Sequence, residues 1–138
     1  MAKARVKKIV NIDASVLWGR VKTFDGMDKI LPGMIQTCQV SGAPTAGAKR
    51  VCGMENGKLE ETLLSIDHDK RTLSYSVDND DAPLPVSGYK GTATITSIGP
   101  GKSEFSWSAE FEPKGMSEGE VVGMLEQVFT QIVENFSK

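Results

Sequence analysis

The second half of the chain holds two long stretches in which apolar and polar residues alternate, followed by one long amphipathic helix. Residues 91–96 place Gly, Ala and Ile between threonines, and residues 104–111 place Phe, Trp, Ala and Phe between glutamates and serines. A period of two gives a strand one apolar and one polar face. The helix, from about Glu118 to Phe136, carries a wide apolar stripe, made of Val121, Val122, Leu125, Val128, Phe129, Ile132, Val133 and Phe136. A curved sheet folded over such a helix can leave room between them, which favours a ligand-holding module.

The length of 138 residues is enough for one domain with a substantial core, so we expect a single domain over residues 1–138. The net charge is −2, and the basic residues are scattered apart from a cluster at Lys3, Arg5, Lys7 and Lys8. This distribution argues against a nucleic-acid surface, which needs a basic face or stripe. The cluster is more typical of an edge strand protected by lysines than of a phosphate or membrane contact.

No apolar run is long enough to span a bilayer, and the first residues lack the apolar core of a signal peptide. We therefore expect a cytoplasmic protein without integral membrane association. Cys38 and Cys52 lie on separate predicted strands and form no CxxC pair, so in that compartment we expect two reduced thiols that behave as small hydrophobes.

The sequence suggests neither a metal nor a cofactor. His68 is the only histidine, so no four-ligand zinc set exists. The acidic run at residues 78–81 lacks the Gly and the distal Glu of a calcium loop, and a solvated turn is the favoured interpretation.

The order of elements is one strand, two short helices, six strands and one long helix. Asp13 and Asp25 are the expected N-caps of the short helices, and Ser117 with Glu120 predicts a capping box for the long one. Asn56-Gly57 predicts a tight hairpin turn. The predicted strands cover residues 6–12, 34–40, 49–55, 59–66, 73–77, 87–98 and 102–112.

Several short motifs occur in the order and spacing of one known superfamily. They are Val16-Leu17-Trp18 with Phe24-Asp25, Leu31-Pro32-Gly33, the series Gly57, Glu61, Leu63 and Asp67, Leu73-Ser74-Tyr75, Pro83-Leu84-Pro85 with Tyr89, and the run from Trp107 to Pro113. With these motifs the chain resembles the SRPBCC or START-like superfamily, and within it the polyketide cyclase/dehydrase and lipid-transport branch. The resemblance implies an α+β helix-grip fold, in which a seven-stranded antiparallel sheet wraps a long C-terminal helix and two short helices follow the first strand. It also implies an internal cavity for a small, mostly hydrophobic ligand.

Alternation and the resemblance together select the candidate cavity residues. Gly91 is of interest because a missing side chain in mid-strand leaves space. Some of these residues must form ordinary core, and the alternation does not separate the two roles. The candidates are Gln36, Glu61, Leu63, Tyr75, Leu84, Tyr89, Gly91, Trp107, Phe111, Leu125 and Phe129.

Glu61 is the most unusual of them, because it shares a strand face with Leu59 and Leu63. A buried carboxylate is costly unless it is paired or protonated, so such a position invites a functional reading. The alternative register points Leu64 and Ile66 inward and leaves Glu61 in water. The resemblance favours the inward position, since related plant hormone receptors carry a cavity glutamate there.

Two further polar residues are weaker candidates. Gln36 shares parity with Cys38 and Val40, and it matches a cavity lysine of the same receptors. Lys8 shares parity with Val6 and Val10, so it either enters the cavity near Glu61 or reaches water along its flexible stem.

Binding or transport of a lipid, polyketide or aromatic metabolite is the leading functional hypothesis. The alternative is a cyclase or dehydrase that uses Glu61 and Tyr89 as general acid/base groups. A third interpretation is an interaction protein whose interior is filled by aromatic side chains. No Ser-His-Asp set, metal cluster or phosphate loop supports a hydrolase, a metalloenzyme or a nucleotide enzyme. The sequence identifies neither the ligand nor the oligomeric state.

Overall fold

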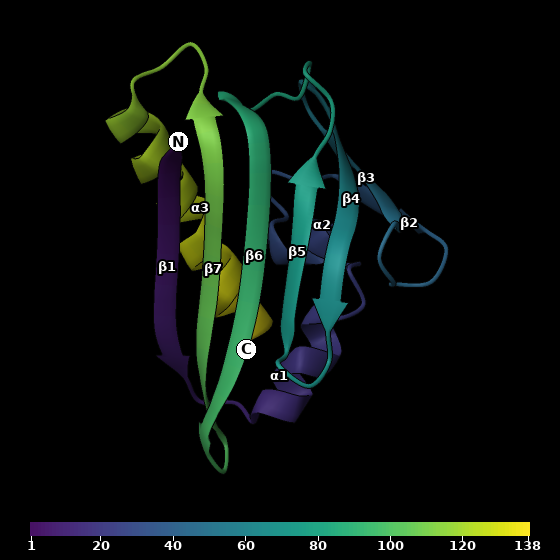
Figure 1. Cartoon of the computed structure of the whole chain (residues 1–138), viewed down its shortest axis with the longest axis vertical. Coiled ribbons are helices and arrows are strands. Elements are labelled where there is room, and N and C mark those ends of the chain that lie inside the picture. The colour runs from purple at the N-terminus through teal and green to yellow at the C-terminus, as the bar shows by residue number, and fades with distance from the viewer.

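The computed structural model describes residues 1–138 and shows an antiparallel seven-stranded sheet that curves around a long helix (Figure 1). The strand order is β1-β7-β6-β5-β4-β3-β2, so β1 and β2 are the two edges. This arrangement confirms the predicted α+β helix-grip fold. The elements are β1 (Ala2–Val10), α1 (Ala14–Val21), α2 (Met27–Ile30), β2 (Thr37–Ser41), β3 (Lys49–Met54), β4 (Gly57–Asp67), β5 (Thr72–Val77), β6 (Val86–Gly99), β7 (Lys102–Pro113) and α3 (Glu118–Phe136).

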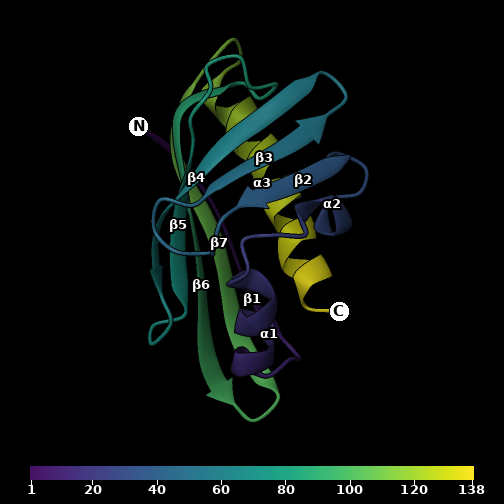
Figure 2. The same ribbon diagram turned by 90° about the vertical axis from the view of Figure 1, so that its right-hand side faces the viewer.

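The long helix α3 covers the inner face of the sheet, while α1 lies at the lower end of the sheet and α2 lies beside α3 next to β2 (Figure 2). The long helix packs mainly against β1 and β7. Near its C-terminus the Phe136 ring stacks on Trp107, with centroids 6.2 Å apart and planes at 17°. From α1, Arg20 Nη1 donates to the carbonyls of Phe136 at 2.7 Å and Lys138 at 2.6 Å. The end of α3 is therefore fixed to both the sheet and α1.

The helix caps follow the sequence signals in two of three cases. The Asp13 carboxylate accepts from Ser15 N at 3.2 Å, and Ser117 Oγ accepts from Glu120 N at 3.3 Å. Asp25, by contrast, does not occupy the N-cap of α2, because Gly26 takes that place in a left-handed conformation with φ of 82°.

The segment after α2 is a turn rather than the predicted start of a strand. The amides of Met34 and Ile35 both donate to the Leu31 carbonyl, at 3.0 and 2.8 Å. The strand β2 therefore begins at Thr37, three residues later than predicted from residue 34.

The turn between β3 and β4 differs from the prediction by one residue. Its two central residues are Glu55 and Asn56, while Gly57 pairs with Met54 as the first residue of β4. Gly57 has a φ of 150°, in the region that favours glycine. This register sets Arg50 directly opposite Glu61.

A bulge in β4 shows why two registers both looked possible from the sequence. The pairing with β5 shifts between Leu63 and Ser65, which leaves Leu64 as an extra residue that is 41% exposed. Before the bulge Glu61 and Leu63 point inward, and after it Ile66 packs against the core. Of the alternative register, only the inward position of Ile66 agrees with the structure, since Leu64 is exposed and Glu61 is buried.

The two cysteines face each other across β2 and β3 and are joined in a disulfide. The expectation of two reduced thiols is therefore wrong. Their Cα atoms are 4.1 Å apart, because Cys38 and Cys52 are directly paired in the strand register. The sequence shows two strands with one cysteine each, but it does not show which residues oppose each other.

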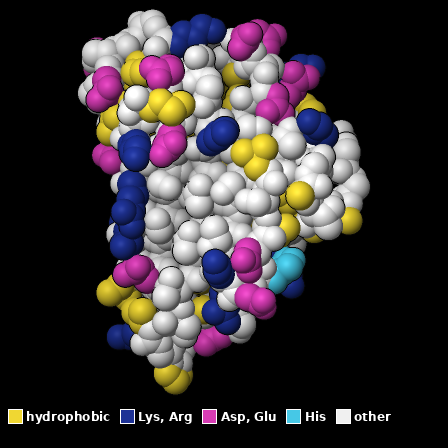
Figure 3. Space-filling model, viewed as in Figure 1, with side chains coloured by type: hydrophobic (Ala, Val, Ile, Leu, Met, Phe, Trp, Pro, Cys, Tyr) yellow, Lys and Arg dark blue, Asp and Glu magenta, His cyan; other side chains and the backbone are white.

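The outer face of the sheet is polar and hollowed (Figure 3). Hydroxyl side chains line a depression of about 520 Å³, and one row in register across β5, β6, β7 and β1 consists of Ser74, Thr92, Ser108 and Arg5. On the edge strand Lys3 pairs with Glu110 at 3.4 Å, which fits the predicted edge. No helix is long and apolar enough to cross a membrane.

The disulfide predicts a stability that depends on reducing agent. The cysteines are 14 residues apart, and cross-links of loops of this length contribute about 3 kcal/mol in the chain-entropy description. Urea unfolding of the wild type should show a loss of about 2–3 kcal/mol on adding a dithiol reductant. The double variant Cys38→Ala/Cys52→Ala should be insensitive to the reductant. A wild type that is equally insensitive would show that the thiols are free.

Candidate functional site

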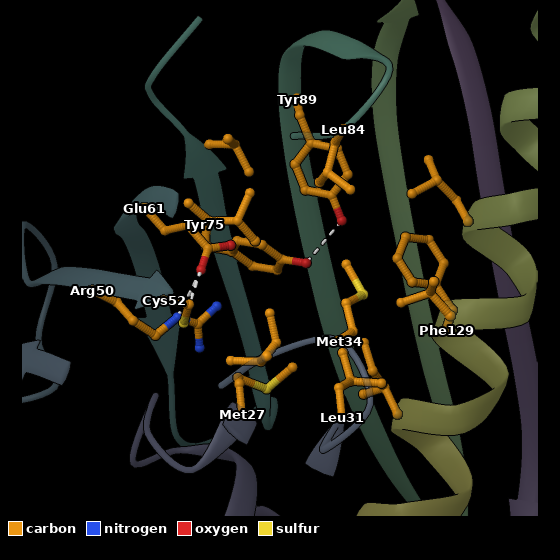
Figure 4. Close-up of a pocket in the computed structure, with 16 residues that line it drawn as sticks. Met27, Leu31, Met34, Arg50, Cys52, Glu61, Tyr75, Leu84, Tyr89 and Phe129 are labelled. Carbon is orange, nitrogen blue, oxygen red and sulfur yellow. Dashed lines mark hydrogen bonds and ion pairs between the residues drawn. The ribbon is translucent and has the colours of Figure 1, made fainter. Parts of the chain in front are cut away.

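An apolar cavity lies between α3 and the part of the sheet formed by β3 to β6, closed at one end by α2 and the turn after it (Figure 4). Its volume is about 50 Å³, enough for a few water molecules. Fourteen of the sixteen lining residues are hydrophobic. The lining consists of Met27, Leu31, Met34, Ile35, Arg50, Cys52, Leu59, Glu61, Tyr75, Val77, Leu84, Tyr89, Leu125, Val128, Phe129 and Ile132.

One wall of the cavity contains a buried ion pair. Arg50 Nε donates to Glu61 Oε1 at 2.9 Å, and the two residues are 4% and 5% exposed. The Cys52 sulfur lies 3.8 Å from the same carboxylate oxygen. Removing one partner of such a pair typically costs about 3–5 kcal/mol, because the other charge stays buried without compensation.

The Arg50 guanidinium also holds the loop between α1 and α2. Its Nη1 donates to the Phe24 carbonyl at 3.0 Å, and its carbon lies 3.9 Å from the centre of the Phe24 ring. Phe24 has a φ of 61°, a left-handed conformation that costs a residue with a side chain about 1–2 kcal/mol. The contacts with Arg50 compensate for this strain and fix the position from which α2 starts.

A second polar group is a chain of three aromatic side chains. Trp107 Nε1 donates to the Tyr75 hydroxyl at 3.1 Å, and the hydroxyls of Tyr75 and Tyr89 are 2.8 Å apart. Figure 4 shows both tyrosine hydroxyls pointing toward each other in the cavity. The two rings come from neighbouring strands, β5 and β6, on the same sheet face.

Both tyrosines are acids that stay protonated well above neutral pH. Burial raises the pKa of Tyr75 to about 12, and the negative charge of Glu61 adds to this rise. Burial also raises the pKa of Tyr89 well above its ordinary value of 10.0, with Tyr75 as the next cause. At neutral pH the pair therefore offers hydroxyl donors.

The structure separates the predicted cavity residues into three groups. Glu61, Tyr75, Leu84, Tyr89, Leu125 and Phe129 line the cavity. Leu63, Trp107, Phe111 and Gly91 lie in or against the core without lining it, and Trp107 reaches the cavity only through Tyr75.

Gln36 forms the third group, because it is exposed and Ile35 lines the cavity instead. The predicted cavity position of Gln36 is wrong, since the turn after α2 replaces the strand on which its parity was based. Lys8 also lies outside the cavity. Its ammonium pairs with Glu134 of α3 at 2.9 Å, where both side chains are about half exposed.

Gly91 provides space, but a protein side chain fills it. A Cβ at this position would collide with the Tyr75 ring. The glycine thus lets Tyr75 lie flat over β6 and reach Tyr89.

Ten of the lining residues were not among the predicted candidates: Arg50, the four residues contributed by α2 and its turn (Met27, Leu31, Met34 and Ile35), and Cys52, Leu59, Val77, Val128 and Ile132. Arg50 shares strand parity with the buried Cys52, and a buried Glu61 calls for a cation, so a signal existed. The structure contains no group of three or more His, Cys, Asp or Glu side chains that could hold a metal ion.

Comparison with known proteins gives a family and a fold. Residues 1–138 match the model of the family described as polyketide cyclase/dehydrase and lipid transport. None of the curated proteins is similar enough in sequence to count as a match. An uncharacterised protein from Bacillus thuringiensis has a similar structure, with a TM-score of 0.84 and 20% identity over 99% of this chain and 96% of its own.

Two further solved structures share the fold. A Thermobifida fusca protein has a TM-score of 0.74 and 26% identity, over 96% of this chain and 85% of its own. Norcoclaurine synthase from Thalictrum flavum, in complex with dopamine and hydroxybenzaldehyde, has a TM-score of 0.73 and 15% identity, over 98% and 83%.

The close approach at Gly91 predicts that Gly91→Ala is destabilising. The added methyl forces the Tyr75 ring to move, and overpacking of this kind costs about 1–3 kcal/mol. The matched control is Gly123→Ala in α3, where a Cβ meets nothing within 4 Å and the free energy of unfolding should rise by about 0.5–1 kcal/mol. Thermal unfolding of both variants measures the difference. Equal effects would mean that the ring does not occupy the Gly91 position.

The raised pKa of Tyr75 predicts a loss of stability in alkali. In the unfolded chain a tyrosine loses its proton near pH 10, whereas folded Tyr75 keeps it to about pH 12. The stabilisation is complete below pH 10 and falls through the window from 10 to 12, by about 2–3 kcal/mol. Tyr75→Phe should make this decline smaller and leave the part that Tyr89 contributes.

A direct measurement is available because the chain has only two tyrosines. Phenolate absorbance of the folded protein should be nearly absent at pH 10.5 or so, where the denatured protein is mostly ionised. Half-ionisation of the folded protein near pH 10 would contradict the buried pair.

Proposed function

Because the chain belongs to the polyketide cyclase/dehydrase and lipid transport family, we propose that it binds a small, largely apolar molecule in the cavity between α3 and the sheet. The observation that carries the proposal is the composition of the lining, with fourteen hydrophobic residues of sixteen. The only charged groups in it are Arg50 and Glu61, which neutralise each other. Such a lining favours apolar ligands held by a few placed polar groups.

The ligand must move part of the wall when it binds. A cavity of about 50 Å³ holds a few water molecules but not a molecule of ten or more heavy atoms. The adaptable side of the wall is formed by Met27 and Met34, whose unbranched side chains repack easily, and by Leu84 in the linker before β6. The rest of the polar lining, with the ion pair and the tyrosines, is fixed by hydrogen bonds. We propose that binding displaces the adaptable side.

The complex of norcoclaurine synthase supports the size class. That protein shares this fold and is found with dopamine and hydroxybenzaldehyde, both small aromatic molecules. Small aromatic molecules are therefore the first ligands to try.

Filling the cavity from α3 should block binding. Val128 lines the cavity, and Val128→Phe inserts a ring where the ligand would lie. The affinity for N-phenyl-1-naphthylamine, a neutral apolar fluorophore, should fall by about tenfold or more, since the lost burial of even one small ring exceeds 1.4 kcal/mol. The measurement is a fluorescence titration.

The control is Val122→Phe on the same helix, which does not line the cavity. This variant should bind the fluorophore as the wild type does. Equal loss in both variants, or no loss in either, would place the fluorophore elsewhere. Native mass spectrometry of the protein purified from its own host then identifies the natural ligand as a co-purified small molecule.

A further inference from the structure

We propose that the cavity selects a neutral ligand whose polar end is a hydrogen-bond acceptor, as in a ketone or an ester, over a carboxylate of the same shape. This inference rests on the proposed function and adds the chemical class of the ligand's polar end. It follows from counting donors and charges in the cavity wall.

The two tyrosines leave one hydroxyl proton without an acceptor. Tyr75 and Tyr89 have two O–H donors, and the bond between their hydroxyls uses one of them, whichever way it points. Trp107 contributes a third donor, which Tyr75 accepts. No other acceptor in the protein takes the remaining proton, and both side chains line the cavity. The free proton therefore needs an acceptor from the ligand or from water.

The charges of the wall disfavour an anion. The single cation, Arg50, is already paired with Glu61 at 2.9 Å and bonded to the Phe24 carbonyl. Arg50 and Glu61 compensate each other, so the wall carries no net positive charge. A ligand carboxylate would leave water and find no uncompensated cation in the cavity. A ligand carbonyl is uncharged, so it avoids the cost of desolvating a charge, and it accepts a hydrogen bond from the free tyrosine hydroxyl.

Burial supports the same assignment, because it keeps the tyrosines protonated. Both phenols have pKa values raised above 10.0, so the donor persists throughout the neutral range. The two hydroxyl oxygens lie 2.8 Å apart in an otherwise apolar cavity. A hydrogen bond from the free hydroxyl to a ligand is stronger there than in water.

Three probes of similar size test the inference: 2-acetylnaphthalene, 2-isopropylnaphthalene and 2-naphthoate. Each is titrated against bound N-phenyl-1-naphthylamine, and the readouts are two ratios of affinity, ketone to hydrocarbon and ketone to carboxylate. In the wild type the ketone should bind about tenfold or more tightly than the carboxylate. A carboxylate that binds as tightly as the ketone would overturn the inference.

The tyrosine variants give a prediction that depends on how many hydroxyl protons of Tyr75 and Tyr89 lack an acceptor. Tyr89→Phe removes one donor and one acceptor together, so one O–H stays free and the ketone-to-hydrocarbon ratio should change less than about threefold. The double variant Tyr75→Phe/Tyr89→Phe has no O–H, and Trp107, whose N–H loses its acceptor, does not line the cavity, so the ratio should fall about tenfold. The matched control Thr92→Val removes a hydroxyl from the outer face of β6 and should leave both ratios unchanged. An unchanged ratio in the double variant would overturn the inference.

The charge argument predicts that removing the Glu61 charge reverses the discrimination against the carboxylate. Glu61→Gln frees the Arg50 cation, so the affinity for 2-naphthoate should rise by about tenfold or more while that for the ketone changes little. If this variant does not fold, the neutral pair Arg50→Gln/Glu61→Gln replaces it and should still reject the carboxylate. Failure of the fluorophore to bind the wild type would defeat the proposed function itself, whereas binding without ketone preference would defeat this inference alone.

Discussion

The ion pair between Arg50 and Glu61 joins β3 and β4 to the loop that carries α2. Both charges are buried, so each depends on the other, and the same guanidinium holds the Phe24 carbonyl and ring. Because Phe24 is strained, the loop keeps its shape only while these contacts persist. The wall formed by Met27 and Met34 therefore takes its position from the charge pair in the neighbouring part of the lining. The Arg50–Glu61 pair thus fixes the polar part of the cavity lining and also the position at which α2, with Met27, begins.

The fold itself was predictable because its signals are local. Alternation of period two identified β6 and β7, the apolar stripe and capping box identified α3, and the order of elements then allowed few topologies. The inward position of Tyr75, Tyr89 and Trp107 follows from the same alternation. For these elements, local pattern and global packing agree, which is usual in sequences that specify one structure.

The site was less predictable because it depends on register, which single residues change. Had Asn56 and Gly57 been the central turn residues, Cys52 would oppose Glu61; the turn at Glu55 and Asn56 brings Arg50 there instead. The bulge at Leu64 then reverses the inward face within β4. The disulfide between Cys38 and Cys52 and the contact of Gly91 with Tyr75 likewise depend on which residues pair across neighbouring strands. None of them leaves a periodic trace in the sequence, since each concerns which residues oppose one another.

The small size of the cavity and the pairing of the polar groups in its wall are related. In the empty protein the charges neutralise each other and the aromatic hydrogen bonds form a chain, so a single hydroxyl proton is left over. A water molecule in the cavity can accept that proton, so the protein does not need a ligand to satisfy its buried polar groups, and the methionine side of the wall can close over the remaining space. A ligand that enters gains apolar contact and replaces water that has few partners in this lining. Affinity then comes mainly from shape and apolar area, while the one free proton decides how the ligand is oriented.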